Sequence, residues 1–171
     1  MNLALLAKQG WRVVTRQASI LYKLLKGRYF RNTSFLNAKV GYNPSFGWRS
    51  MLEGRKVVRK GKRWRVGDGK GIDIWKDPWV PRQTDFYMRG ARNDGPRYVS
   101  QCTKNGKWDT ELVKSVMDSD NANLVLAIPL SRQQIRDRLV WNHTKSGNYL
   151  TSSGYLSTRN MKRNGELGGS C

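Results

Sequence analysis

The N-terminal third of the chain carries one pattern three times, in which apolar side chains recur at helical spacing and basic residues fill the positions between them. This spacing predicts α-helices over residues 3–14, 20–29 and 45–60, because positions three and four apart share one face of a helix. Ser19 is a suitable N-cap for the second helix, and Gly61 is a suitable stop for the third. In the third run the residues at this spacing are Trp48, Met51, Leu52, Arg55 and Val58.

The charge of the chain is strongly positive and unevenly spread. Its net charge is +20, from 32 Lys and Arg against 12 Asp and Glu, and no acidic residue precedes Glu53. Residues 1–70 contain 17 basic residues and only two acids, Glu53 and Asp68. Such a surface attracts polyanions. Nucleic acid is the favoured partner, and an anionic membrane surface is the second possibility.

Basic residues are densest in the third predicted helix and just after it. We expect them to contact phosphates of RNA or DNA without reading the base sequence, because the phosphate backbone dominates non-specific affinity. The predicted nucleic-acid-binding residues are Arg49, Arg55, Lys56, Arg59, Lys60, Lys62, Arg63 and Arg65.

The stretch GKRWRVGDGKGIDIWKDPWVP, residues 61–81, predicts a β-hairpin that turns at Asp68-Gly69. Two interpretations of it stay open. In one, its basic residues bind phosphates while Trp64 or Trp75 stacks on a base. In the other, its apolar side chains pack the hairpin onto the third helix. Alternation along the strand favours Trp64 inside, with Arg63 and Arg65 pointing outward.

Three ligand-binding loops are excluded for this stretch. A phosphate loop needs Gly-Lys followed by Ser or Thr, but Gly61-Lys62 precedes Arg63. A dinucleotide loop needs a different glycine spacing and a helix after it. A calcium loop needs alternating oxygen ligands and a closing Glu, which the residues after Asp68 do not provide.

The remaining sequence predicts shorter elements. Asp109 is a good N-cap for a short helix, a second helix fits residues 120–127, and a second hairpin fits residues 138–150. A further helix is expected to start near Ser152 or Ser153. The fold class is therefore α+β, mostly helical, with one or two β-hairpins, a long central loop and a disordered C-terminal tail. The predicted segments are a basic helical region (1–61), a hairpin (62–81), a loop (82–107), short helices with a second hairpin (108–156) and a disordered tail (157–171).

Catalytic, cofactor and metal sites are not expected from the sequence. His143 is the single histidine, and Cys102 and Cys171 lie far apart, so a four-ligand zinc set is missing. The densest group of carboxylates is explained by turn formation and solvation. These carboxylates are Asp68, Asp73 and Asp77. The two cysteines suggest an intracellular setting, in the nucleus or the cytoplasm.

The N-terminus raises one further alternative. Residues 1–30 are basic, acid-free and amphipathic, which is also typical of an organellar transit peptide. The mitochondrion is therefore the less favoured alternative location. No apolar run reaches the length of a membrane span, so a membrane is not an expected partner.

Five segments follow one another in a recognisable order over residues 3 to about 156. They are LALLAKQGWRVVT, LYKLLKGRYF, FLNAKVGYNPSFGWRSMLEGRKVV, GKRWRVGDGKGIDIWKDPWVP and, after the loop, IPLS with DRLVWNHTKSGNYLTSSGY. The chain resembles the polyprotein of plant LINE-type (non-LTR) retrotransposons. More narrowly, it resembles the connector between the polymerase thumb and the zinc-binding and RNase H regions.

The resemblance implies a parent enzyme that copies RNA into DNA with Mg²⁺ held by aspartates. No Asp-Asp pair of that kind occurs in this chain, so no catalytic residue is carried over. The expected function is a catalytically inert fragment that binds RNA or DNA and contacts the rest of the polyprotein. The alternative is a host-expressed basic structural or interaction protein, with targeting to an organelle as one form of it. The positions that match the connector are Trp11, Trp48, Arg49, Trp64, Arg65, Trp75, Asp77, Pro78 and Trp79.

Overall fold

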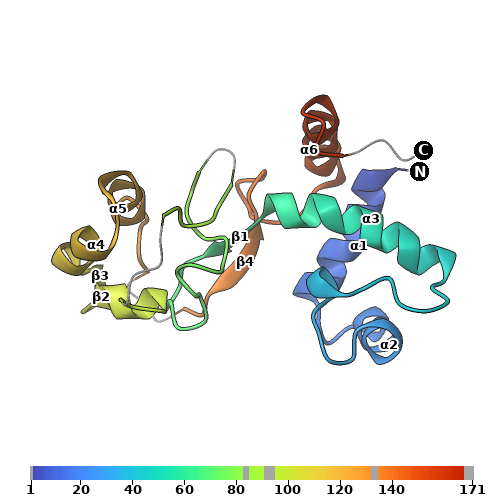
Figure 1. The fold of residues 1–171 in the computed structure, drawn as a ribbon, viewed down its shortest axis with the longest axis horizontal. Helices are drawn as coiled ribbons and strands as arrows, with labels where there is room; N and C mark the ends of the chain where they lie inside the picture. Colours follow the sequence, from blue (N-terminus) through green and yellow to red (C-terminus); the bar gives the residue numbers. More distant parts are fainter. Residues whose placement is uncertain (1, 83–84, 91–94, 132–134, 168–171) are drawn as a thin grey trace. The chain divides into compact units, whose positions relative to one another are not determined.

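The computed structural model describes residues 2–82, 85–90, 95–131 and 135–167 (Figure 1). The chain divides into two compact units. The first unit joins residues 1–62 to residues 141–171, and the second unit comprises residues 63–140. Helices and short strands are both present, which confirms the α+β class predicted from the sequence.

The first unit is helical. Polar side chains cap several of its helices, and Ser19 accepts a hydrogen bond from the Tyr22 N–H at 3.2 Å, as expected of an N-cap. The three helices predicted in the N-terminal third are confirmed, and the third ends at Gly61. The elements are α1 (Leu3–Thr15), α2 (Ile20–Tyr29), η1 (Phe35–Asn37), α3 (Phe46–Gly61) and α6 (Thr151–Arg163).

Aromatic side chains form much of the core of the first unit. Trp48 is fully buried, and the Tyr29 ring stacks on it with centroids 4.5 Å apart. A second group joins Trp11 and Trp141 edge to face at 5.8 Å. Beside them, the Tyr149 hydroxyl donates to the Ala4 carbonyl at 2.9 Å, and burial raises the pKa of Tyr149 to about 12. Residues 3–15, which by composition alone suit a presequence, therefore belong to this packed core.

The second unit contains most of the strand structure. The strand β1 (Lys62–Arg65) crosses the unit boundary and pairs with β4 (Arg138–Trp141). The other elements are η2 (Val99–Cys102), β2 (Thr103–Lys104), β3 (Lys107–Trp108), α4 (Thr110–Val116) and α5 (Ser119–Leu126). Asp109 caps α4 and accepts from the Leu112 N–H at 3.1 Å, as predicted.

The hairpin of the structure lies where a loop was predicted. Strands β2 and β3 pair antiparallel across a turn at Asn105-Gly106, where φ is +53° and +71°. An Asn-Gly pair with both φ values positive is the preferred two-residue hairpin turn. Residues 83–84 and 91–94 of the predicted loop lie outside the described residues.

The hairpins predicted over residues 62–81 and 138–150 are wrong. Strand β1 pairs with β4 rather than with residues 72–75, whose backbone pairs with residues 97–99. After β4, the Trp141 N–H closes a tight loop on the Gly147 carbonyl at 2.8 Å instead of starting a second strand. Long-range pairing therefore outweighs the local turn signals in both places.

The predicted disorder of residues 157–171 is wrong for residues 157–163. The helix expected near Ser152 begins at Thr151 and runs to Arg163. Thr158 and Met161 are buried, so this helix belongs to the first unit's packed interior. Residues 168–171 lie outside the described residues.

Candidate nucleic-acid interface

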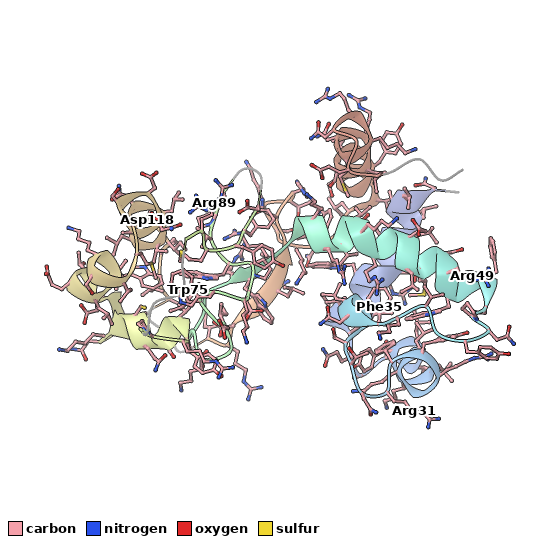
Figure 2. The ribbon with its side chains drawn as sticks, in the orientation of Figure 1. Arg31, Phe35, Arg49, Trp75, Arg89 and Asp118 are labelled. Atoms are coloured by element: carbon pink, nitrogen blue, oxygen red, sulfur yellow. The ribbon has the colours of Figure 1, made fainter. Side chains whose placement is uncertain are left out.

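Helix α3 presents a row of exposed side chains that is mostly basic. Arg49, Lys56 and Lys60 are exposed, with Glu53 among them. Their spacing places them along one side of the helix, opposite the buried stripe that includes Met51 and Val58. Figure 2 shows Arg49 projecting from α3. We call Arg49, Lys56 and Lys60 the α3 basic row.

Two members of the α3 basic row form ion pairs. Lys56 lies 2.9 Å from Glu53, and Lys60 lies 2.9 Å from Glu166. The lysine side chains in these pairs are 51% and 50% exposed, so water screens both interactions. Exposed pairs of this kind contribute little to stability.

Arg55 and Arg59 both hydrogen-bond to backbone carbonyls; Arg55 is half-buried and Arg59 is exposed. Their phosphate contacts stay a prediction. The Arg55 guanidinium donates to the carbonyls of Phe35 and Ala38, and Arg59 donates to the Leu36 carbonyl. Burial lowers the pKa of Arg55, and the neighbouring Arg59 charge lowers it further. Both side chains fasten η1 to α3. The signal for Arg55 was its position within the apolar stripe of the third helix.

The three basic residues of β1 differ in exposure. Lys62 is half-buried in the first unit, while Arg65 is exposed in the second. Arg63 is half-buried, so its predicted outward position is wrong. Burial lowers the pKa of Arg63, with a smaller contribution from Arg65. Arg65 is therefore the exposed basic residue of this strand.

The Gly-Asp-Gly-Lys-Gly loop binds a carboxylate of the same chain. The Gly67 and Gly69 N–H groups donate to Oδ1 of Asp137 at 2.8 and 2.9 Å, and the Gly71 N–H donates to its Oδ2 at 3.0 Å. Convergent backbone N–H groups form an anion-binding nest. We call this arrangement the Asp137 nest. Sequence reasoning missed Asp137, although glycines spaced by two signalled an unusual turn.

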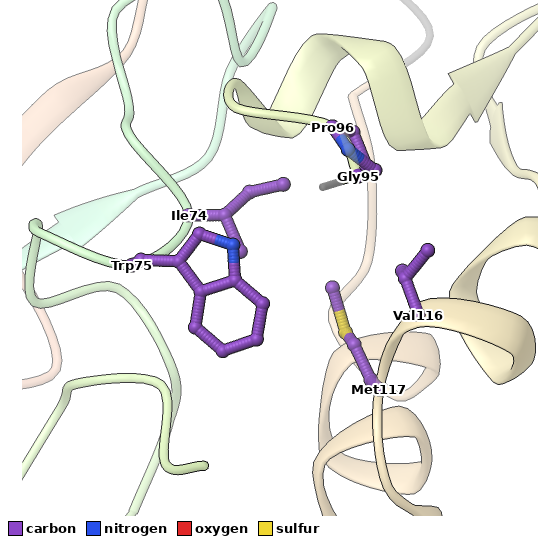
Figure 3. Close-up of a pocket in the computed structure, with 6 residues that line it drawn as sticks. All are labelled: Ile74, Trp75, Gly95, Pro96, Val116 and Met117. Carbon is purple, nitrogen blue, oxygen red and sulfur yellow. The ribbon is translucent and has the colours of Figure 1, made fainter. Parts of the chain in front are cut away.

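The tryptophans considered for base stacking pack within the second unit. Trp64 and Trp75 are half-buried against a core that includes Ile72, Ile74 and Val113. Figure 3 shows the Trp75 indole beside Ile74 and facing Val116 and Met117. The pocket at this point has no room for a water molecule. The rings are packed, as the second interpretation expects, but its hairpin and its third-helix partner are wrong, because the core partners belong to the second unit.

The clustered aspartates bind backbone groups. Asp73 accepts from the N–H groups of Trp75 and Lys76, and Asp77 accepts from the Asp73 N–H at 2.8 Å. Burial alone would raise the pKa of Asp73, but these donors and Arg97, 3.2 Å away, lower it overall. Within the described ranges, no group of three His, Cys, Asp or Glu side chains could hold a metal ion.

Cys102 should resist alkylation in the folded protein at neutral pH. Its side chain is 1% exposed, and burial, followed by the charge of Asp109, raises the pKa of its thiol to about 11. Because the thiolate is the reactive form, a Cys171→Ser variant should react slowly with iodoacetamide until the pH approaches 11. The same variant in urea is the control and should react fast. Equal rates with and without urea would contradict the buried position of Cys102.

Across the part of the chain that the structure describes, no helix combines the length and the apolar character that a bilayer crossing requires.

His143 is exposed, with its ring edge-on to Trp141 at 5.0 Å, and partial desolvation lowers its pKa.

Comparison with known proteins relates the chain to two plant proteins. It is 39% identical over 83 residues to the Uncharacterized mitochondrial protein AtMg00310 of Arabidopsis thaliana, which covers 48% of this chain and 54% of that protein. It is 28% identical over 169 residues to the Putative ribonuclease H protein At1g65750 of Arabidopsis thaliana, which covers 91% of this chain and 26% of that protein. The chain thus spans about half of the first relative and about a quarter of the second. No family model and no solved structure matches it. The chain is therefore similar to plant proteins, one of them named for ribonuclease H.

Proposed function

We propose that the chain binds RNA or DNA without sequence preference, as a catalytically inert segment of a plant LINE-type retrotransposon reverse transcriptase polyprotein. The observation that carries the binding part is the exposure of the α3 basic row. This row begins within a long N-terminal stretch that has no acidic residue before Glu53. Exposed lysine and arginine side chains neutralise phosphates and release counterions. The polyprotein part is supported by the ordered motifs of residues 3–156 and by similarity to a protein named for ribonuclease H.

Removing the α3 basic row should reduce the salt dependence of nucleic-acid binding more than removing the same number of charges elsewhere. Each phosphate contact contributes about −0.9 to the slope of log K against log salt on duplex DNA. The triple variant Arg49→Gln/Lys56→Gln/Lys60→Gln should therefore show a slope shallower by roughly 2 to 3. Fluorescence anisotropy with a labelled duplex, at a series of salt concentrations, measures this slope.

The matched control removes three exposed lysines of the second unit. The variant Lys104→Gln/Lys107→Gln/Lys114→Gln has the same net charge as the α3 variant. If the slope becomes shallower by the same amount in both variants, the binding reflects overall charge and the α3 basic row is not the interface. Wild-type affinity that does not change with salt would overturn the proposed function itself.

The absence of catalysis is also part of the proposal. A two-metal polymerase needs clustered carboxylates, whereas Asp73 and Asp77 are engaged with backbone N–H groups. Primer extension by the purified chain, abolished by EDTA, would overturn it.

Long-read sequencing of the transcript tests the retroelement part, which predicts an in-frame polymerase motif upstream and a Cys/His cluster downstream.

A second candidate is a host protein that works in an organelle. The observation that favours it is the name of one relative, an Arabidopsis mitochondrial protein. A fluorescent fusion of the full chain that accumulates in mitochondria would support this candidate, and a fusion that stays outside mitochondria and plastids would reject it.

A further inference from the structure

Two aromatic side chains of the first unit are directed into water. Tyr42 is completely exposed and Phe46, at the first position of α3, is 76% exposed. Trp48 and Phe35 of this unit are buried, whereas Tyr155 of α6, far from these two exposed rings in the sequence, is also exposed at 57%. Large exposed aromatic rings that sit close together in the chain point to a binding surface, because burial is their usual state.

Tyr42 lies between two residues with left-handed backbone conformations. Gly41 and Asn43, on either side of it, both have left-handed φ angles, of +79° and +49°. A positive φ is uncommon for a residue other than glycine, and such conformations concentrate at functional sites. Pro44 further restricts the chain immediately after Asn43. The fully exposed ring of Tyr42 therefore stands on a loop whose backbone is left-handed on both sides of it.

Side-chain hydrogen bonds anchor this loop at both ends. The Trp48 indole N–H donates to the Val40 carbonyl at 3.1 Å. At the other end, the Tyr29 hydroxyl donates to the Ser45 hydroxyl at 2.9 Å, and the Ser45 hydroxyl accepts from the Trp48 N–H at 3.2 Å. Since Tyr29 also stacks on the buried Trp48, the loop is seated on the core of the unit. An anchored loop loses little conformational entropy on binding.

The neighbouring charges are positive. Lys39 and Arg49 are exposed on either side of the two rings in the sequence, within a region that has no acidic residue before Glu53. Flat aromatic faces flanked by cations suit unpaired bases joined by phosphates. A duplex, whose bases are stacked on each other, offers only its phosphates to such a surface.

We infer that Tyr42 and Phe46 form a base-stacking platform for single-stranded RNA or DNA, with Lys39 and Arg49 binding the flanking phosphates. The inference rests on the proposed nucleic-acid binding and adds that single strands are preferred to duplexes. Base stacking on one aromatic ring changes affinity by about tenfold.

The test compares four forms of the full chain with two RNA probes. The variants are Tyr42→Ala/Phe46→Ala and the control Ile20→Ala/Leu24→Ala, which truncates two exposed apolar side chains of α2. The probes are a labelled oligouridylate and a duplex of the same length. We expect the aromatic variant to bind the oligouridylate at least about tenfold more weakly while its duplex affinity is unchanged. The control should match wild type with both probes, and the aromatic swap Tyr42→Phe/Phe46→Tyr should retain single-strand binding.

Distinct outcomes separate this inference from the proposed function. If wild type binds both probes with a strong salt dependence and the aromatic variant binds them equally well, the stacking platform is rejected and the proposed function stands. An equal loss with both probes also rejects stacking. If wild type binds neither probe, the proposed function fails as well. Selective loss of binding to anionic phospholipid vesicles, with RNA binding intact, would reassign the surface to a membrane.

Discussion

Alanine at position 54 should destabilise the first unit by about 2 kcal/mol, although alanine is the better helix former. A Cβ atom at Gly54 would lie 2.5 Å from the Leu6 carbonyl carbon and 2.6 Å from the Ala7 nitrogen. Both atoms belong to the backbone of α1, so no side chain can rotate away. The two helices would have to separate, and the buried contacts between them would loosen.

The same substitution at another helical glycine is the control. A Cβ at Gly27 of α2 would meet nothing within 4 Å, so Gly27→Ala should stabilise the chain by roughly 0.5 to 1 kcal/mol. Urea unfolding followed by circular dichroism gives both free energies, and hydrogen exchange of α1 and α3 peptides locates the change. A Gly54→Ala chain as stable as wild type would show that α1 and α3 do not approach so closely.

Helix positions could be predicted from the sequence because their determinants are local. Ser19 and Asp109 cap helices that begin where the sequence indicates, and Gly61 ends α3 as expected. A cap and the apolar stripe that follows it lie within a few residues of each other, so the pattern itself contains the interaction. The need for glycine at position 54 could not be predicted in this way, because it arises from a close approach to Leu6 on another helix.

The candidate site was only partly predictable for the same reason. Arg49, Lys56 and Lys60 are exposed as expected, because a helix of known register fixes which face is polar. Arg55 and Arg59 were assigned to phosphates because sequence cannot show that η1 places its carbonyls beside them. Charge alone counts all five residues as equal, whereas the fold half-buries Arg55 and leaves the other four exposed, with Arg59 also bonded to a backbone carbonyl.

Removing the carboxylate of Asp137 should destabilise the second unit by about 3 kcal/mol. Asp137→Ala leaves the N–H groups of Gly67, Gly69 and Gly71 without their acceptor. Gly69 is buried and has a φ of +68°, so its N–H cannot turn to another partner without rebuilding the loop. Hydrogen exchange at these glycines and urea unfolding of the full chain measure the loss. Asp68→Ala, in the same loop, is the control, and it should change stability by less than about 0.5 kcal/mol because Asp68 caps a single exposed N–H.

Two further measurements identify the cause of that loss. Asp137→Asn keeps one acceptor oxygen but puts an amide NH₂ in place of the other, so about half of the destabilisation should remain.

In Asp137→Ala the nest is emptied, and added formate should raise the melting temperature more than it does in Asp68→Ala, because the three N–H groups can bind a small anion. Both variants gain one unit of charge, so a general effect of salt on a +20 chain would raise the two temperatures equally. An equal rise, or an Asp137→Ala chain as stable as Asp68→Ala, would mean that Asp137 does not hold the loop. The unequal rise would show that the Gly-Asp-Gly-Lys-Gly loop is an anion site that the chain fills from its own sequence, 66 to 70 residues away.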